Sequence, residues 1–352
     1  MVNKCLLTGF VIFILGIFFF FINFNKFNYF YNTNNIKTSP KKILYVYTYN
    51  SFINQWGVGT YIKTEFEKQC NCKLRWVRAG DSRMLLRRMQ LLNNDRVDLV
   101  IGLDQFSMIE ASSLFKWKKV QVKANWVLPI KKSIKNNPMI GTYFFPYDWS
   151  PMGFIYKKGL KNIPQSFSDL LNPELKNKIA LQNPLTSSPG MQLLIAINLT
   201  LKKPKSFLTQ LRKSTKHISN SWSKSYTLFK AQHKSIVFSY LSSVAYHIIE
   251  ENNFNYKMAI FKTPHPYQIE MMAIPNRCKN CKLSKQLLKF LLTNKIQKKI
   301  MFKNFMFPVI KGVSDNSVFS KLIKPKLLDY SVSKKFIKTS LKLWKQNFLY
   351  IK

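Results

Sequence analysis

The stretch "SIVFSYLSSVAYHIIE", residues 235–250, changes from the pattern of a strand to that of a helix within one turn. Its apolar first half predicts a buried strand, and its second half has the spacing of a helix. The turn between them carries Ser242 and Ser243, with Tyr240 and Tyr246 on either side. A hydrophobic core disfavours hydroxyl groups without partners. The junction therefore predicts a ligand pocket where the strand stops.

The rest of the chain repeats this alternation of strands and helices. Strands are predicted at 43–49, 73–77, 98–103, 152–156, 236–240 and 268–274, and helices at about 58–69, 82–93, 189–201, 206–215, 245–251 and 283–301. Alternating elements of this kind predict an α/β fold, with a parallel sheet covered by helices on both faces. A chain of 352 residues is long enough for two domains with separate cores.

The charge of the chain is strongly positive, with a formal net charge of +41. Such a charge is typical of proteins that bind nucleic acid or membranes. Lysine is enriched here together with asparagine, isoleucine and phenylalanine, which indicates a general compositional bias. Arginine, which reads phosphates and bases most specifically, is scarce. We therefore expect no nucleic-acid partner.

The N-terminal residues predict export. Residues 5–24 contain no charged side chain and are long enough to span a bilayer. The run is long for a signal peptide, and no A-x-A-like cleavage site follows it. Residues 1–24 are therefore either a signal peptide or an uncleaved membrane anchor. Residues 25–42 are polar and rich in asparagine, as expected of a linker.

Four cysteines follow the N-terminal segment, as Cys70 with Cys72 and Cys278 with Cys281. A C-x-x-C pair can be redox-active or form half of a zinc site, but no second pair has metal-site spacing. In an exported chain, structural disulfides are the more typical use of cysteine. A bridge from Cys70 to Cys72 would close a small, strained ring, which argues against that pairing.

Motifs of catalysis and cofactor binding are missing. The sequence contains no G-x-G-x-x-G, P-loop, H-E-x-x-H or G-x-S-x-G motif. His247, Glu250 and Glu251 lie on one predicted helix, where an exposed charged face is a simpler interpretation than a metal site. We expect no catalytic residue, no metal and no cofactor.

Several residues near predicted strand ends have both a structural and a binding interpretation. Ligands of open parallel sheets bind beyond the carboxyl ends of the strands. Asp81 either caps a helix or offers a carboxylate to a cationic ligand. Ser187 and Ser188 either cap a helix or form an anion or hydroxyl site at its N-terminus. Trp56 and Trp222 either fill the core or form platforms for a ring or a cation.

Six motifs, taken in order, resemble the periplasmic thiamine-binding proteins of bacterial thiamine ABC importers. They are "YVYTYNSF" with "WG" after it, "FEKQCNC", "DLVIGLD", "NPLTSSPG", "SWSKSY" and "SIVFSYLSSVAYHIIEE". The resemblance implies a two-lobed type II periplasmic binding protein fold, each lobe a mostly parallel sheet flanked by helices. The implied N-terminal lobe is 43–148 plus 262–352, and the implied C-terminal lobe is 149–261.

The resemblance also implies a ligand and partners. The ligand would be thiamine, thiamine monophosphate or thiamine diphosphate, delivered to an inner-membrane permease with its ATPase. We expect a periplasmic monomer whose only membrane contact is the N-terminal segment, which would tether it if uncleaved. The implied ligand contacts are Asp81, Ser82, Ser187, Ser188, Trp222, Tyr240, Leu241, Ser242 and Ser243, with Tyr49, Trp56 and Tyr246 as aromatic walls.

The chain departs from the family pattern at a few positions. Asn50 stands where the family has an acidic residue, and Ser221 where glycine is usual. Leu241 and Val244 replace a threonine and a proline. Asn50 removes one carboxylate that could lie near a cationic ligand.

Three alternatives remain open from the sequence. The first is a binding protein for another solute, such as iron or a polyamine; iron sites of this fold use tyrosinate pairs with few tryptophans, so Trp56 and Trp222 argue against iron. The second is a thiamine-degrading enzyme on a similar scaffold, which would need a nucleophilic cysteine at the cleft. Cys70 and Cys72 instead follow a predicted helix end. The third is a chain that folds but has lost binding.

Overall fold

The computed structural model describes residues 41–80, 82–91, 96–329 and 332–349. The predicted N-terminal segment at residues 1–24 lies outside these residues, as does all but the end of the predicted linker. Within the described ranges, no helix is both long enough and apolar enough to cross a membrane. All the elements below belong to the unit Lys42–Lys352.

One continuous sheet runs through this unit. In sheet order its strands are β2 (Cys72–Arg78), β1 (Lys42–Thr48), β3 (Leu99–Asp104), β9 (Tyr267–Ala273), β4 (Phe144–Lys157), β7 (Ile236–Tyr240), β5 (Ile179–Gln182) and β6 (Ile218–Ser219). Two further strands, β8 (Tyr256–Ala259) and β10 (Phe307–Pro308), pair with β4. The predicted strands all form, and β4 is much longer than the predicted 152–156.

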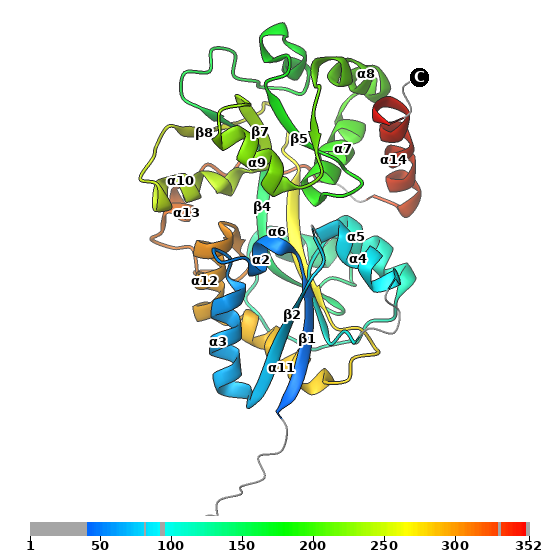
Figure 1. Ribbon diagram of the computed structural model, residues 1–352, viewed down its shortest axis with the longest axis vertical. Helices are drawn as coiled ribbons and strands as arrows, with labels where there is room; N and C mark the ends of the chain where they lie inside the picture. Colours follow the sequence, from blue (N-terminus) through cyan, green and yellow to red (C-terminus); the bar gives the residue numbers. More distant parts are fainter. Residues whose placement is uncertain (1–40, 81, 92–95, 330–331, 350–352) are drawn as a thin grey trace, which may run out of the picture. The chain divides into compact units, whose positions relative to one another are not determined.

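The strands divide into two parallel groups joined by antiparallel pairs. Strand β1 is parallel to β2 and β3, and β5 is parallel to β6 and β7. Strand β4 is antiparallel to both β9 and β7. Figure 1 shows β4 and β9 running side by side from one lobe into the other. The prediction of mostly parallel sheets thus holds for the outer strands of each lobe and not for the crossing strands.

Helices cover the sheet in both lobes. They are α2 (Asn50–Ile53), α3 (Gly59–Cys70), α4 (Ser82–Leu91), α5 (Gln105–Leu114), α6 (Leu128–Asn136), α7 (Ser188–Thr200), α8 (Pro204–Ser214), α9 (Trp222–Lys230), α10 (Val244–Glu250), α11 (Cys281–Leu291), α12 (Asn294–Asn304), α13 (Val318–Lys321) and α14 (Lys334–Phe348). Short 3-10 turns are η1 (Ser168–Leu171), η2 (Pro173–Leu175) and η3 (Leu241–Ser243). The helix predicted at 283–301 is two helices, because the backbone of Thr293 is extended.

The C-terminal helix corrects one predicted lobe boundary. The range 262–352 was predicted to lie wholly in the N-terminal lobe, but α14 packs against α7 and α8 in the other lobe (Figure 1). Its apolar residues recur at helical spacing, so they form one face. Ile337 and Trp344 on that face are buried in a cluster with Leu208 and Leu211 of α8.

A second correction concerns the first cysteine pair. Cys70 and Cys72 form a disulfide, although the strain of so small a ring argued against that pairing. Asn71 between them adopts a left-handed conformation with φ 43°, which asparagine tolerates better than most residues. This turn at the end of α3 brings the two Cα atoms to 5.1 Å, within the normal range for a bridge.

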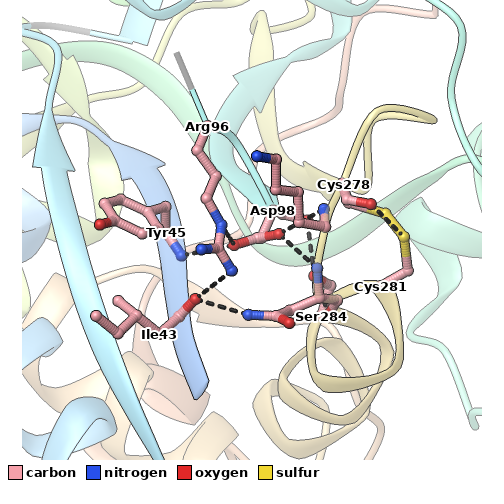
Figure 2. Close-up of polar contacts among 9 residues, drawn as sticks. Ile43, Tyr45, Arg96, Asp98, Cys278, Cys281 and Ser284 are labelled. Atoms are coloured by element: carbon pink, nitrogen blue, oxygen red, sulfur yellow. Dashed lines mark hydrogen bonds and ion pairs between the residues drawn. A yellow bond between two sulfur atoms is a disulfide. The ribbon is translucent and has the colours of Figure 1, made fainter. Parts of the chain in front are cut away.

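The second disulfide, Cys278–Cys281, lies where a loop enters α11. Figure 2 shows the loop beside Asp98, whose Oδ1 accepts the backbone N–H groups of Lys279 at 2.9 Å and Asn280 at 2.8 Å. Asp98 Oδ2 accepts the N–H of Tyr45 at 3.0 Å and Nε of Arg96 at 3.2 Å (Figure 2). One buried carboxylate therefore ties β1 to the disulfide loop.

Candidate functional site: an aromatic cavity

The junction at residues 235–250 folds as its pattern predicts, with β7, the turn η3 and helix α10 in succession. The two serine hydroxyls of the turn have different surroundings. Ser242 is fully buried, and its Oγ donates to Oγ of Ser150 at 2.9 Å. Ser243 pairs instead with Ser239, with 3.1 Å between the two Oγ atoms.

A cavity of about 440 Å³ lies next to this junction. Its size is in the range of sites for small organic ligands. Segments distant in sequence meet around it, from α2 and the residues beside it through α9 and η3 to β9 and the end of α12. Its lining residues are Tyr49, Ser51, Asn54, Trp56, Gly57, Trp222, Ser223, Tyr226, Thr227, Lys230, Tyr240, Ser243, Tyr246, Glu270, Lys303, Asn304, Phe305 and Met306.

The structure brings together half of the predicted contact residues. Those that line the cavity are Tyr49, Trp56, Trp222, Tyr240, Ser243 and Tyr246. Leu241 is buried at 1% exposure and does not line it, and neither does Ser242. In a turn as tight as η3, successive side chains leave in different directions, so only part of the turn can face a ligand.

The predicted serines at α7 are also buried away from the cavity. Ser187 and Ser188 are both fully buried, and neither hydroxyl has a hydrogen-bond partner in the described structure. Ser187 is the N-cap residue of α7, but its side chain makes no capping hydrogen bond. Asp81 lies outside the described residues, and Ser82 is the first residue of α4. Contact of these four residues with a ligand stays a prediction.

Trp222 anchors one wall of the cavity. It is the first residue of α9, and Ser221 caps that helix by accepting the N–H of Lys224. The indole Nε1 of Trp222 donates to Oγ of Ser239 at 2.9 Å, which fixes the plane of the ring. The ring centroid lies 5.0 Å from that of Tyr226 and 5.9 Å from that of Tyr240. A planar ligand can stack on such a wall.

Lys230 and Tyr246 form a cationic corner of the cavity. Lys230 Nζ lies 4.7 Å above the ring of Tyr246, and it donates to the Tyr246 hydroxyl at 3.0 Å and to Glu251 at 2.6 Å. Burial alone would lower the pKa of Lys230, but hydrogen bonds to Glu251 and Tyr246 outweigh it and raise that pKa. The ammonium group of Lys230 therefore remains charged, and it forms an ion pair with the carboxylate of Glu251.

The floor of the cavity contains Glu270, which the sequence analysis missed. Its Oε2 accepts the hydroxyl hydrogens of Tyr49 at 2.6 Å and Tyr147 at 2.5 Å. Its Oε1 accepts from Gln268 Nε2 at 3.0 Å and from the hydroxyl of Tyr240 at 3.3 Å. The sequence could have indicated this residue, because Glu270 is the single carboxylate inside the apolar strand "QIEMMAI". A charge in a buried strand is costly unless it has partners.

Beside Glu270, the register of β4 against β9 places Asp148 directly opposite. Burial raises the pKa of Asp148 well above its usual range, and the charge of Glu270 raises it further, with a smaller opposing effect from the hydrogen bond of Asn304. The pKa values of Tyr49 and Tyr147 are also raised, first by burial and then by Glu270. Both phenols therefore stay neutral and donate to the carboxylate.

Two lobes joined by crossing strands, with an aromatic cavity lined by residues of both, define a class of proteins that bind small solutes. The family model described as bacterial extracellular solute-binding protein matches residues 62–325. The chain belongs to this family.

Individual relatives are similar over most of their length. The chain is 35% identical over 289 residues to the thiamine-binding periplasmic proteins of Salmonella typhimurium (strain LT2) and of Escherichia coli (strain K12). Each alignment covers 81% of this chain and 86% of the relative. A solved structure of a periplasmic thiamin binding protein superposes with a TM-score of 0.77 at 30% identity, covering 88% of this chain and 97% of that one. These likenesses confirm the predicted type II binding-protein fold.

Proposed function

We propose that this chain binds thiamine, or one of its phosphate esters, in the aromatic cavity and delivers it to an ABC permease with its ATPase. The observation that carries the proposal is the wall of Trp222, Tyr226 and Tyr240 around a cavity of about 440 Å³. Thiamine has a flat aminopyrimidine that stacks on aromatic rings and a thiazolium cation that aromatic faces attract. The named relatives and the superposed structure support the same ligand.

Phosphate esters of thiamine have a complementary group in the same cavity. Lys230 and Lys303 both line it. The Nζ atom of Lys230 lies 2.6 Å from a carboxylate oxygen of Glu251, and that of Lys303 lies 3.6 Å from one of Glu250. A phosphate can draw these ammonium groups toward itself. The buried hydroxyls of Ser187 and Ser188, with Asp81 and Ser82, remain part of the proposed ligand set.

A binding role without catalysis fits the state of the four cysteines among the described residues, which are all in disulfides. A thiamine-degrading enzyme on this scaffold would need a nucleophilic thiol at the cavity. Cys70 and Cys72 are joined in one disulfide, and Cys278 and Cys281 in another. The lining residues given above include no cysteine. Neither a cofactor nor a resident metal is part of the proposal, and the protein acts as a monomer.

The test is a titration of the full chain, purified in mild detergent, with thiamine and its monophosphate. Tryptophan fluorescence reports binding because Trp222 and Trp56 line the cavity. We expect saturable binding with one site per chain. Spermidine and ferric ion serve as the comparison ligands. Tighter binding of either than of thiamine would reject the proposal in favour of another solute.

Cell fractionation tests the proposed location. The relatives named above are periplasmic proteins, and we place this chain in the periplasm as well. An uncleaved segment 1–24 would hold it at the inner membrane. N-terminal sequencing of the mature protein distinguishes the two cases: a chain that starts near residue 40 and is released by osmotic shock would rule out the anchor.

A further inference from the structure

The positive charge of the chain poses a problem for a cationic ligand. With a net charge of +41, the protein as a whole repels a thiazolium ring. Asn50 also lacks the negative charge that the thiamine-binding family, which this sequence resembles, carries at that position. Among the described residues that line the cavity, the one carboxylate is Glu270.

The surroundings of Glu270 stabilise its ionised form. The side chain is 3% exposed, and four neutral groups donate to it: the hydroxyls of Tyr49, Tyr147 and Tyr240, and the amide of Gln268. Hydrogen bonds of this kind favour a carboxylate over a carboxylic acid. Burial and the charge of Glu270 raise the pKa of Asp148 opposite it, and the four donors favour Glu270 as the member of the pair that carries the negative charge.

Two of these donors also form the walls of the cavity. Tyr49 and Tyr240 each line it and each direct a hydroxyl group at Glu270. A phenol that donates to a carboxylate gains electron density in its ring. An electron-rich ring attracts a cation over its face more strongly.

We propose that Glu270 supplies the fixed negative charge that selects a cationic ring in this cavity, both directly and through the rings of Tyr49 and Tyr240. This inference rests on the proposed function and names the group that recognises the cation. A unit charge about 6 Å away, at an effective dielectric constant of about 20, changes a binding constant about 100-fold. Screening by solvent reduces this effect, so we expect at least about a tenfold change.

The experiment compares two ligands of one shape and different charge. The first is thiamine, and the second is an analogue whose thiazolium is replaced by a neutral thiophene ring. Titration calorimetry of the full chain gives both dissociation constants for the natural protein and for Glu270→Gln. We expect Glu270→Gln to weaken thiamine binding about tenfold or more and analogue binding less than about threefold. Because only folded protein binds, the ratio of the two constants is insensitive to partial unfolding.

One further variant serves as a control and another as a second test. Asp148→Asn changes the neutral partner of the pair, and we expect it to leave the ratio of the two constants within about twofold. Tyr147→Phe removes one donor to Glu270 without touching the cavity lining, and we expect a smaller shift with the same sign. Tyr147→Phe also provides the test if Glu270→Gln does not fold.

The possible outcomes separate the two proposals. Equal losses for both ligands in Glu270→Gln would mean that the residue only shapes the cavity, and the inference would be wrong. A selective loss in Asp148→Asn alone would place the charge on Asp148 and also overturn it. If the natural protein fails to bind thiamine, the proposed function itself falls, and the inference falls with it.

Discussion

Trp222 and Tyr226 lie one turn apart on α9, with ring centroids 5.0 Å apart and an interplanar angle of 31°. The cavity wall is therefore a pair of rings on one helix, held in place by the hydrogen bond of Trp222 to Ser239. A ligand that stacks on Trp222 meets a ring that is already oriented. Such preorganisation lowers the entropic cost of binding.

Removal of this ring should weaken binding strongly. An aromatic anchor in a desolvated pocket typically contributes about 2 kcal/mol or more. We expect Trp222→Ala to weaken thiamine binding by roughly 30-fold or more, measured by calorimetry, with little change in the circular dichroism spectrum. Trp56→Ala is the matched control, because Trp56 also lines the cavity but is 73% exposed. Equal losses in the two variants would contradict the assignment of Trp222 as the anchor.

Local sequence patterns predicted the strand and helix that carry part of this site, whereas the surroundings of Glu270 depend on contacts between residues far apart in the chain. The strand and helix around Tyr240 and Tyr246 follow from apolar spacing within a few residues. The role of Glu270 depends on Tyr49, which lies 221 residues earlier in the chain, so no local pattern contains it. Leu241 and Ser242 were predicted as contacts, but the geometry of a tight turn directs them inward.

The same limit applies to the lobe boundary and the disulfide. The pattern of α14 predicts an amphipathic helix but not which lobe covers its apolar face. That choice depends on the complementary surfaces of α7 and α8. The bridge between Cys70 and Cys72 depends on a left-handed residue between them, and Asn71 supplies it without the usual steric cost.

Acid should destabilise the fold through buried histidine. The Nε2 atom of His265 accepts the backbone N–H of Phe261 at 2.8 Å, so that nitrogen carries no proton in the fold. Burial lowers the pKa of His265, although a hydrogen bond with the Met152 carbonyl partly offsets this. The unfolded chain, with a histidine pKa of about 6.5, then binds more protons than the folded chain. The free energy of unfolding should therefore fall as the pH drops below about 6.5.

Urea titrations between pH 7.5 and pH 5.5 measure this effect. His265→Gln should be less stable at pH 7.5 but should lose less stability on acidification than the natural protein. Some pH dependence will remain, because burial also lowers the pKa of His247, with Glu251 opposing it. Parallel pH profiles for the two proteins would show that His265 does not contribute.

The disulfide loop at α11 should depend on Asp98 more than on its own bridge. The Cys278–Cys281 bridge closes a very short loop, for which the chain-entropy model gives about 2 kcal/mol. Asp98 is fully buried, and Asp98→Ala leaves the partly buried backbone N–H groups of Lys279, Asn280 and Tyr45 without their acceptor. Removal of a buried charged partner of this kind costs about 3 kcal/mol or more.

Denaturant unfolding of Asp98→Ala and of the double variant Cys278→Ser with Cys281→Ser compares the two losses. We expect the larger decrease in unfolding free energy for Asp98→Ala. Lys279→Ala is the control, since its backbone N–H group is unchanged and its effect should be within about 0.5 kcal/mol. A larger loss from the cysteine variant would mean that the bridge, and not Asp98, holds the loop against β1.

Long-range charge should separate the association rates of the different thiamine forms. The net charge of +41 repels free thiamine, a cation, and attracts thiamine diphosphate, which is net anionic at neutral pH. Salt screens this field over about 10 Å at 0.1 M. Stopped-flow fluorescence should therefore show that added salt speeds the association of thiamine and slows that of the diphosphate. The local charge of Glu270 acts mainly after entry, so Glu270→Gln should change dissociation rates and leave the salt dependence of association the same. If both ligands respond to salt with the same sign, association is not governed by the net charge of the protein.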